Sequence, residues 1–593
     1  MTTRCEHGER CGGCTLLGVE EAEQLQRKHE RVLRAVARYP ALEAIEVQQV
    51  AAAHPSTEYR TRAKLMVSPR GEIGLFARGS HEIVDIPRCR VLAPEVAAVV
   101  SAVRTAVQPG PTRLASLDVR EATCAGQTRV LVTLGGDAGA HAGLSTLAAE
   151  LSRLPQVAGV ALREHGPRAR AFSGGTLGTQ QGARSARDSL LADGPYHLAT
   201  HGAFTQAHRG QAEALALRVI GALEASLPSL RGARVLELYA GSGALGLALC
   251  SRGARCLLVE QLGPALALAE QAAKEQRISG LHTRAGDALE VTRALAAENE
   301  RVDAVIVNPP RRGLPAGLRA SIAALAPRVL VYVSCEPETL ARDASHLRQL
   351  GYGARSLLPH DMMPLTDSVE TLAVLVPTAP PQITVCYEDE DLLAVHKPPH
   401  LPTTPQAGQP SSLLERVRDE RNLPDLAAVH RLDLGTSGVC LLAKRKSVVA
   451  ALAAALAAGE KQYLALVRGV TRDKGSVRRP LRDGDKTREA RTRYTRLQVV
   501  GGHSLLRVRP DEGRTHQIRR HLAAIGHPVL GDARYGDPAS NRHFEHEHGL
   551  DRAFLHLAKV ELTDPKTRRS LVLESALAGD LAAVCDHLEV GAR

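Results

Sequence analysis

Aromatic residues are scarce in this chain of 593 residues: there is no Trp, with five Phe and ten Tyr, and aromatics make up 3% of the total. Any stacking on bases must therefore use a few rings and arginine side chains. Long apolar runs are also missing, since the longest, Val448 to Ala458, is too short to span a bilayer. The polar first residues, MTTRCEHGERCGGC, lack the apolar segment of a signal peptide. We expect a cytoplasmic protein that enters no membrane.

The cysteine count and the charge narrow the class further. Eleven cysteines, an odd number, without a secretion signal favour a reducing compartment and thiol or metal roles over disulfides. The formal net charge of +11 and the pI near 9.2 favour a polyanionic partner. The chain is too long for one hydrophobic core, and its length predicts about three to five domains.

Four cysteines stand apart from the rest. Cys5, Cys11 and Cys14 form C-x5-C-G-G-C, and Cys89 follows in IPRCRVL. Three cysteines this close together in a polar segment do not belong to a hydrophobic core, and the glycines allow the backbone to fold tightly around a ligand. Four thiolates suit an iron–sulfur cluster or zinc. The spacing alone leaves both open.

The segment from Tyr59 to Leu92 alternates in the manner of strands joined by a glycine turn, and it is rich in arginine. These arginines could bind RNA phosphates or form a solvated sheet face, and the pattern favours neither. Residues 91 to 200 give few signals beyond mixed helices and strands.

A strand, a glycine turn and a helix are predicted in RVLELYAGSGALGLAL, after a helix over Gln211–Ala225. The turn contains Gly241, Gly243 and Gly246, and such a turn brings the backbone close to a nucleotide-like ligand at a helix N-terminus. Glu260 ends the next strand, about 20 residues on, where an acid typically binds ribose hydroxyls. By itself this pattern fits a dinucleotide equally well.

Two apolar β-branched runs, Val302–Val307 and Val329–Val333, predict buried parallel strands. The first is followed by Asn308-Pro-Pro-Arg and the second by Ser-Cys335-Glu-Pro. Because ligands bind at the carboxyl ends of strands in an open α/β sheet, both turns should face one crevice. A cysteine there could be a nucleophile, although a lone cysteine in apolar surroundings is more often a small buried residue.

Residues 1 to about 378 resemble the bacterial RNA uracil-5-methyltransferases that carry an iron–sulfur cluster. The resemblance rests on C-x5-C-x2-C with a distant Cys, F-x-Q, LELYAGSGALGL, NPPRRGL, SCEPETLARD and a closing V-E. It implies Cys335 as the nucleophile and Glu370 as the general base. It also implies S-adenosylmethionine contacts from Gln206, Tyr239, Glu260, Asp287 and Asn308, and a 4Fe–4S cluster on Cys5, Cys11, Cys14 and Cys89.

Three positions depart from that family pattern. Asn308 stands where Asp is usual, His208 where Asn usually follows F-x-Q-x, and Ser368 where His usually precedes V-E. The nucleophile and the base are intact. The implied reaction suits these residues, because uracil C5 is a poor nucleophile until a thiolate adds to C6, and a base must then remove the C5 proton.

A Pro-rich stretch, VPTAPPQ, predicts a short, stiff linker before a second domain. This domain contains HRLDLGTSG around Asp433, KQYLALVRG from Lys461, and GRTHQIRRH with GHPVLGDARYG from Gly513 to Gly536. A lone Asp in such a turn is more often a turn or cap residue. A basic stretch runs from Arg472 to Arg496; it begins after Tyr463 and includes Tyr494. We interpret it as a phosphate-binding hairpin rather than a solvated loop.

Residues 383 to about 590 resemble the pseudouridine synthases of the HRLD class, which modify ribosomal and transfer RNA. The resemblance implies Asp433 as the catalytic carboxylate, Arg519 as its partner and Tyr463 packed on the flipped base. Arg431 would help to extrude that base, and no cofactor is implied. We expect Asp433 to be buried next to Arg519 and ionised. The uridine must leave its stack to reach it.

The sequence therefore predicts an α/β and α+β multidomain chain, with a doubly wound methyltransferase sheet followed by a mixed-sheet pseudouridine synthase domain. The expected divisions are an iron–sulfur and RNA-binding region (1–92), a central α/β region (93–203), the methyltransferase domain (204–378) and the synthase domain (383–593). We expect a bifunctional uridine-modifying enzyme with RNA as its partner, 23S rRNA first, and neither DNA nor membrane. The alternatives are tRNA as a substrate of one half, or one half that only binds RNA.

Overall fold

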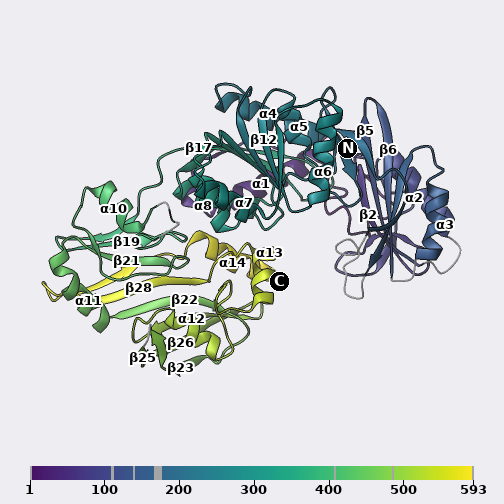
Figure 1. Ribbon diagram of the computed structural model, residues 1–593. Coiled ribbons are helices and arrows are strands. Elements are labelled where there is room, and N and C mark those ends of the chain that lie inside the picture. The colour runs from purple at the N-terminus through teal and green to yellow at the C-terminus, as the bar shows by residue number, and fades with distance from the viewer. Residues whose placement is uncertain are drawn as a thin grey trace.

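The computed structural model describes residues 3–107, 113–137, 141–165, 177–406, 409, 411–483 and 486–590. Figure 1 shows three large sheets, with the eight-stranded one between the other two. We name the three parts by their sheets: the seven-stranded, the eight-stranded and the ten-stranded domain. None of the helices in these described residues is both long and apolar enough to cross a membrane.

The eight-stranded sheet has the order β1-β16-β17-β15-β14-β11-β12-β13. Its strands are β11 (Arg234–Leu238), β12 (Arg255–Glu260), β13 (Leu281–Ala285), β14 (Ala304–Val307), β15 (Val329–Ser334), β16 (Tyr352–His360), β17 (Glu370–Pro377) and β1 (Glu46–Val47). Strands β11 to β15 are parallel. The chain reverses direction of travel across the sheet between β11 and β14, which is the switch point where ligands bind in doubly wound folds.

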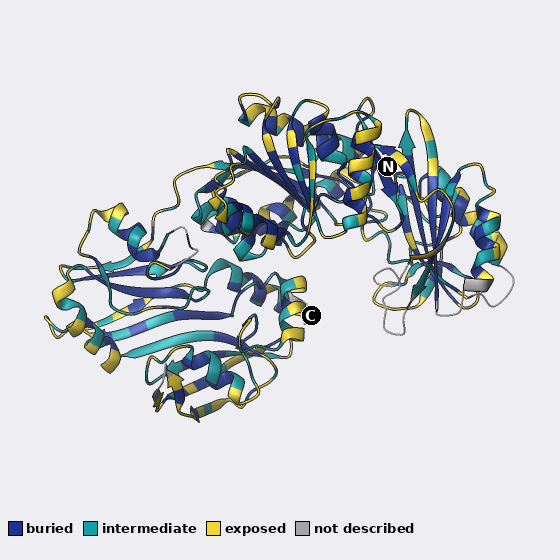
Figure 2. Cartoon of the chain, in the orientation of Figure 1, coloured by how far each residue is buried: buried dark blue, intermediate teal, exposed yellow. Residues whose placement is uncertain are grey.

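The two apolar runs predicted as strands are confirmed as β14 and β15, and every residue of both is buried. Helices cover each face, and Figure 2 colours the strands in the middle of this sheet as buried. Side chains on both sides of the strands therefore enter a core. The helices are α4 (Arg209–Ser226), α5 (Ala244–Cys250) and α6 (Gly263–Glu275) on one face, and α7 (Ala288–Ala297), α8 (Ala316–Ala324), α9 (Pro337–Gln349) and α1 (Glu21–Ala37) on the other.

Strand β17 is antiparallel to both of its neighbours, β15 and β16. Its first residue, Glu370, therefore lies at the edge of the sheet where β14 and β15 end. The register aligns Thr371 with Ser334, one residue before Cys335. One reversed strand thus brings a carboxyl group from late in the chain to the cysteine.

The seven-stranded sheet has the order β4-β3-β2-β5-β6-β7-β8. Its strands are β2 (Arg62–Val67), β3 (Ile73–Phe76), β4 (Ile83–Asp85), β5 (Leu114–Cys124), β6 (Gln127–Asp137), β7 (Val157–His165) and β8 (Leu177–Gly182), with α2 (Pro94–Val107) and α3 (His141–Leu151). Strand β2 pairs with β5, so the division expected between residues 92 and 93 passes through one sheet and one core. A hairpin of β9 (Ser185–Ser189) and β10 (Tyr196–Thr200) follows.

The ten-stranded sheet is mixed, with the order β18-β19-β21-β28-β22-β27-β26-β23 and two side branches. Its strands are β18 (Val385–Glu388), β19 (Leu392–Lys397), β20 (Ala427–Ala428), β21 (Ser437–Ala443), β22 (Glu460–Val467), β23 (Lys474–Arg478), β26 (Arg491–Val500), β27 (His503–Pro510), β28 (Leu555–Thr563) and β29 (Ser570–Glu574). Its helices are α10 (Leu413–Arg421), α11 (Val449–Ala458), α12 (Gln517–Ala524), α13 (Pro538–His548) and α14 (Gly579–Val590).

The basic stretch Arg472 to Arg496 forms the β23–β26 hairpin, extended by the short strands β24 (Leu481–Asp483) and β25 (Lys486–Arg488). Residues 484 and 485 lie outside the described part of the chain. Several of its arginines are paired with acids, for example Arg493 with Asp511 at 2.8 Å. The predicted hairpin is present, while its role toward phosphates stays a prediction.

The two domains joined by the predicted linker also contact each other directly. Arg416 of α10 donates to the side-chain oxygen of Gln349 in α9 at 3.1 Å, across the Pro-rich segment. At the far end of the contact, a nitrogen of Arg38 lies 3.3 Å from Nε2 of His587 in α14. The eight- and ten-stranded domains are therefore docked along a shared face.

Candidate active sites

Four side chains meet where β14, β15 and β17 present their ends: Cys335, Glu370, Gln206 and Arg311. Cys335 follows β15 directly, and Glu370 begins β17. Gln206 hydrogen-bonds the carboxyl group of Glu370, and Arg311 acts electrostatically on both Cys335 and Glu370. We call this group the Cys335 site.

Burial dominates the electrostatics of the Cys335 site. Desolvation raises the pKa of Glu370 to about 7, against smaller opposing effects from Gln206 and Arg311. Burial also raises the pKa of the Cys335 thiol to about 11, and the neighbouring Glu370 adds to the rise while Arg311 lowers it. A carboxyl group that titrates near neutral pH is suited to accept a proton in catalysis.

The glycine turn lies beside this site, after β11. Gly241 and Gly243 have φ of +56° and +71°, and Tyr239 has φ of +61°. A side chain at Gly243 would have its Cβ 2.5 Å from Leu258, so the turn packs closely against β12. Glu260 at the end of β12 accepts hydrogen bonds from the backbone N–H groups of Gly241 and Leu262, each at 3.1 Å.

Asp287 and Asn308 complete the same edge of the sheet. Asp287 caps α7 by accepting from the N–H of Leu289 at 2.9 Å, and its other oxygen accepts from Gln261 at 3.0 Å. Asn308 is partly exposed at the end of β14. Phe204, two residues before Gln206, is 68% exposed, so an aromatic face is available next to the Cys335 site.

His208, one of the departures from the family pattern, is buried and structural. Its Nδ1 accepts from the N–H of Gln211 at the start of α4, and its Nε2 lies 3.1 Å from the Pro55 oxygen. The ring stacks on Tyr59 with centroids 5.2 Å apart. Burial lowers the pKa of His208, which keeps it neutral. It therefore acts as a helix cap at this position.

A second group of polar side chains surrounds Asp433, in the turn between β20 and β21. Arg519 of α12 donates from Nη1 to Asp433 at 3.0 Å. Its Nε and Nη2 bond both oxygens of Asp532, each at 2.7 Å, so Asp532 fixes the guanidinium plane. Nε2 of His516 lies 3.7 Å from Asp433. We call this group the Asp433 site.

The expected burial of Asp433 is wrong, because its side chain is 34% exposed while that of Arg519 is 13% exposed. The carboxylate is therefore accessible to solvent. Tyr463 in β22 is close enough that Asp433 adds to the rise in the tyrosine's pKa, although burial is the main cause. Arg431 is exposed.

Two buried side chains hold the backbone of this turn. The Thr403 hydroxyl donates to the Leu432 oxygen and accepts from the Leu432 N–H, both at 3.1 Å. The buried ammonium of Lys397 donates to the Leu434 oxygen at 3.2 Å. Burial lowers the pKa of Lys397 to about 7. The residues on both sides of Asp433 are therefore fixed by side chains from β19 and the segment after it.

Two family models match the chain: RNA pseudouridylate synthase over residues 391–524, and conserved hypothetical protein 95 over residues 219–353. An uncharacterized RNA methyltransferase of Geobacter sulfurreducens is 32% identical over 395 residues, covering 63% of this chain and 77% of the relative. One of Thermosynechococcus vestitus is 30% identical over 388 residues, covering 63% and 83%. The chain belongs to the RNA methyltransferases.

The methyltransferase also carries a pseudouridine synthase domain, to which the first family model corresponds. Among solved structures, a Pyrococcus abyssi tRNA (uracil-54, C5)-methyltransferase with S-adenosyl-L-homocysteine is 23% identical, with a TM-score of 0.49 over 62% of this chain and 86% of that one.

The four cysteines expected to bind a cluster lie close to one another in the methyltransferase part of the chain. The thiol groups of Cys89, Cys11 and Cys5 all add to the rise in the pKa of Cys14, whose main cause is burial and which reaches about 11. The N–H of Gly13 points at the Cys11 sulfur from 3.4 Å. Yet no three Cys, His, Asp or Glu side chains of the described residues lie where they would hold a single metal ion.

Reasoning from sequence missed Arg311, Asp532 and Lys397. Arg311 lies within the NPPRRGL motif and Asp532 within GHPVLGD, so both were inside recognised motifs without an assigned contact. Lys397 begins KPPHLP, an apolar and proline-rich segment in which a buried lysine is unexpected. Only the packing of β19 behind the turn reveals its partner.

Proposed function

We propose that this chain modifies uridines in RNA twice over: it methylates C5 of one uridine at the Cys335 site and isomerises another to pseudouridine at the Asp433 site. The observation that carries the first activity is the pairing of Cys335 with Glu370, a carboxyl group whose pKa is about 7. The second rests on Asp433 held by Arg519 and Asp532 in a turn that is open to solvent.

In the methylation that we propose, Cys335 adds as the thiolate to C6 of the uracil ring, which makes C5 nucleophilic. S-adenosylmethionine, when bound along Tyr239, Glu260, Asp287 and Asn308, supplies the methyl group. Glu370 takes the proton from C5, and the bond from Cys335 to C6 breaks to return the thiolate. Arg311 favours both ionised groups, because it lowers the pKa of the thiol and that of the carboxyl group.

In the isomerisation, Asp433 acts on a uridine that has left its stack. The glycosidic bond breaks, the uracil rotates, and C5 joins the sugar, with Asp433 as the catalytic carboxylate. Arg519 fixes the carboxylate and Tyr463 packs on the base. The exposed Arg431 assists extrusion. The partial exposure of Asp433 supports this role, because an RNA base must reach the carboxylate from outside.

The Cys335 assignment is tested with RNA that carries 5-fluorouracil at the target, in which no C5 proton can be removed. We expect a covalent adduct that is absent with Cys335→Ala and present with the control Cys124→Ala, a cysteine at the end of β5. An adduct that survives Cys335→Ala would refute the nucleophile.

We further propose that Cys5, Cys11, Cys14 and Cys89 bind a 4Fe–4S cluster rather than zinc. The donor set fits, because three other thiols lie around that of Cys14, and a cubane separates its ligands more widely than one ion does. Anaerobically purified protein should contain roughly four irons per chain together with sulfide. Stoichiometric zinc in that preparation would refute the cluster. The methyl transfer needs no electron, so we assign the cluster a structural or RNA-orienting role.

The target RNA that we propose is 23S rRNA, with both uridines in one hairpin loop. Two tethered RNA-binding domains raise each other's effective concentration on a shared RNA, and loop bases are the easiest to splay into a pocket. Mapping 5-methyluridine and pseudouridine in host strains with Cys335→Ala or Asp433→Asn tests this. Loss of the two marks from different RNAs would refute the shared substrate but neither chemistry.

A further inference from the structure

Two neighbouring residues, Asp551 and Arg552, bond to different domains from one loop between α13 and β28. Asp551 forms ion pairs with Arg319, and lies 3.9 Å from Nε of Arg342, both in the eight-stranded domain. Arg552 donates from Nη1 to the Gly435 oxygen at 2.7 Å, two residues after Asp433. Because the two residues are consecutive in the chain, a backbone shift that displaces one side chain also displaces the other.

On the methyltransferase side, this contact continues to the catalytic loops through Asp343. Asp343 accepts from Arg319 at 2.6 Å and from the N–H of Leu314 at 2.6 Å. Arg342 donates to the Arg312 oxygen at 2.9 Å. These bonds fix the end of the NPPRRGL loop, which contains Asn308 and Arg311, and they fix helix α9, which begins directly after the SCE turn of Cys335.

On the synthase side, the Arg552 guanidinium is held rigidly. It forms two bonds with Asp580 at the start of α14, at 2.5 and 2.8 Å, and a further one with the Ser437 hydroxyl at 3.2 Å. Gly435 and Ser437 flank the link between the Asp433 turn and β21. The position of Arg552 therefore determines how the turn enters the sheet.

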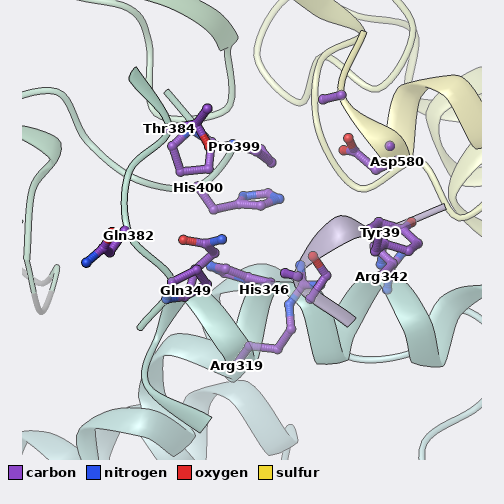
Figure 3. A pocket seen from close by; sticks show the side chains of 16 residues that line it. Tyr39, Arg319, Arg342, His346, Gln349, Gln382, Thr384, Pro399, His400 and Asp580 are labelled. Carbon is purple, nitrogen blue, oxygen red and sulfur yellow. The ribbon is translucent and has the colours of Figure 1, made fainter. Parts of the chain in front are cut away.

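A second connection runs through the segment from Lys397 to His400. Lys397 bonds the Leu434 oxygen, while Nε2 of His400 lies 3.4 Å from Asp551. The His400 ring packs on His346 of α9, with centroids 4.7 Å apart. Figure 3 shows the two rings facing each other in the pocket of about 340 Å³ between the domains, with Arg319 and Asp580 also in its wall. The same two catalytic segments are thus joined twice.

The charges in this contact are balanced and shielded from water. Arg319 and Asp343 are fully buried, and the side chains of Arg342 and Asp551 are each 6% exposed. Two cations face two anions, so removing one leaves a buried charge without compensation, which is strongly destabilising for that arrangement. The network therefore permits one docked geometry of the two domains.

We propose that Asp551 and Arg552 are positioning residues shared by the two active sites, through which each domain sets the catalytic loop of the other. The inference rests on the proposed function for its kinetic readout but not for its structural one. Its content is reciprocal: a change in the synthase domain alters methylation, and a change in the methyltransferase alters pseudouridine formation. A network seen in a structure becomes a coupling only when such cross-effects are measured.

The test uses the full chain with Asp551→Asn and Arg319→Met, followed by amide hydrogen exchange and by both activities. In Asp551→Asn we expect faster exchange at Leu314, and in Arg319→Met faster exchange at Thr436, whose N–H bonds the Asp433 oxygen at 2.9 Å. Each variant should lower, by about tenfold, the kcat of the reaction catalysed by the other, unmutated domain. Displacing a reacting group by about 1 Å can lower the rate a hundredfold.

The matched control is Arg416→Met, which also removes an arginine from the domain contact. Its bonds go to Gln349 and to the Pro381 oxygen, it forms an ion pair with Glu420, and none of these partners belongs to a catalytic loop. We expect both kcat values and both loop exchange rates to stay within about twofold of the wild type. A loss equal to that of Asp551→Asn would mean that docking in general, not this pair, sets the loops, and would overturn the proposal.

The double variant Arg319→Met/Asp551→Leu distinguishes the loss of positioning from the cost of an unpaired buried charge. It removes one cation and one anion together and leaves Arg342 and Asp343 as a balanced pair. We expect its melting temperature to recover relative to the single variants while exchange at Leu314 and Thr436 stays fast. If Asp551→Asn does not fold, Asp551→Glu keeps the charge and shifts the carboxylate. Amide exchange that changes only within the mutated domain would refute the proposal. A wild-type chain without activity on RNA would instead refute the proposed function.

Discussion

The Cys335 and Asp433 sites each contain one carboxyl group to which we assign a catalytic role, and they hold it in opposite ways. Glu370 is 6% exposed, it forms no ion pair with any residue in the described part of the chain, and burial raises its pKa to about 7. Asp433 is 34% exposed and accepts from Arg519, which a second carboxylate orients. The carboxyl group to which we assign proton removal is therefore held by burial, while the one to which we assign the isomerisation is held by a hydrogen bond from a guanidinium.

The sharpest way to break this comparison is to delete one site and measure the other. Cys335→Ala should lower methylation by about a thousandfold or more, because no other group can form the bond to C6. Asp433→Asn should do the same to pseudouridine formation. Each variant should keep the other activity close to that of the wild type. Mass mapping of both modifications in one RNA preparation measures this, and retained pseudouridine formation by Asp433→Asn would remove the proposed mechanism.

The role of Glu370 is sharpened by Glu370→Gln, which keeps the shape of the side chain but cannot take a proton. Methylation turnover should fall by about 10²- to 10⁴-fold. Since C5 methylation precedes proton removal, a methylated covalent adduct on Cys335 should accumulate. Intact-protein mass spectrometry with a short RNA detects it. A variant that is slow but leaves no adduct would place Glu370 before the methyl transfer.

At the Asp433 site, the geometry of the guanidinium is expected to matter more than its charge. Arg519→Lys keeps the charge but cannot bond Asp532 with two nitrogens and Asp433 with a third, so turnover should fall about ten- to a hundredfold. Asp532→Asn, which leaves Arg519 in place but loosens it, should have a smaller effect of the same kind. Single-turnover rates measure both. Equal activity of Arg519→Lys and the wild type would show that charge alone suffices.

The smallest expected effect is on pH dependence, and it separates the two sites without a change at the nucleophile. Glu370 is a base only when ionised, so methylation should rise with pH through about 7, and it should go on rising above 7 because the thiolate of Cys335 forms only toward a pKa of about 11. The ratio of methylation to pseudouridine formation should rise with it. Initial rates of both reactions on one RNA between pH 6 and 8 measure this ratio.

The same shift predicts a change in stability with a definite sign. The pKa of Glu370 is raised from its ordinary value of 4.5 to about 7, so the folded protein binds the extra proton. The favourable contribution is complete below pH 4.5, decreases as pH rises, and is lost above 7, with a difference of about 3 kcal/mol. Glu370→Gln should therefore be more stable than the wild type at pH 8 and lose this advantage near pH 4.5. Denaturant unfolding at the two pH values tests it.

Much of the local structure was predictable because short apolar runs between turns leave few choices. Val302–Val307 and Val329–Val333 were predicted as strands and form β14 and β15, and the helix predicted over Gln211–Ala225 forms α4. The division at residues 92 and 93 was not predictable in this way. Strands β2 and β5 pair across α2, and a pairing between segments so distant in sequence leaves no local signal.

The sequence by itself determined which residues we propose for the chemistry, because Cys335, Glu370, Asp433 and Arg519 stand within motifs whose residue types the proposed reactions require. Only the tertiary structure decided their environment. Whether Asp433 is buried or one-third exposed depends on how its turn leaves the sheet. That Asp551 and Arg552 face different domains depends on the docking of two folded bodies. Burial and long-range ion pairs arise from packing between distant segments, and no local pattern encodes them.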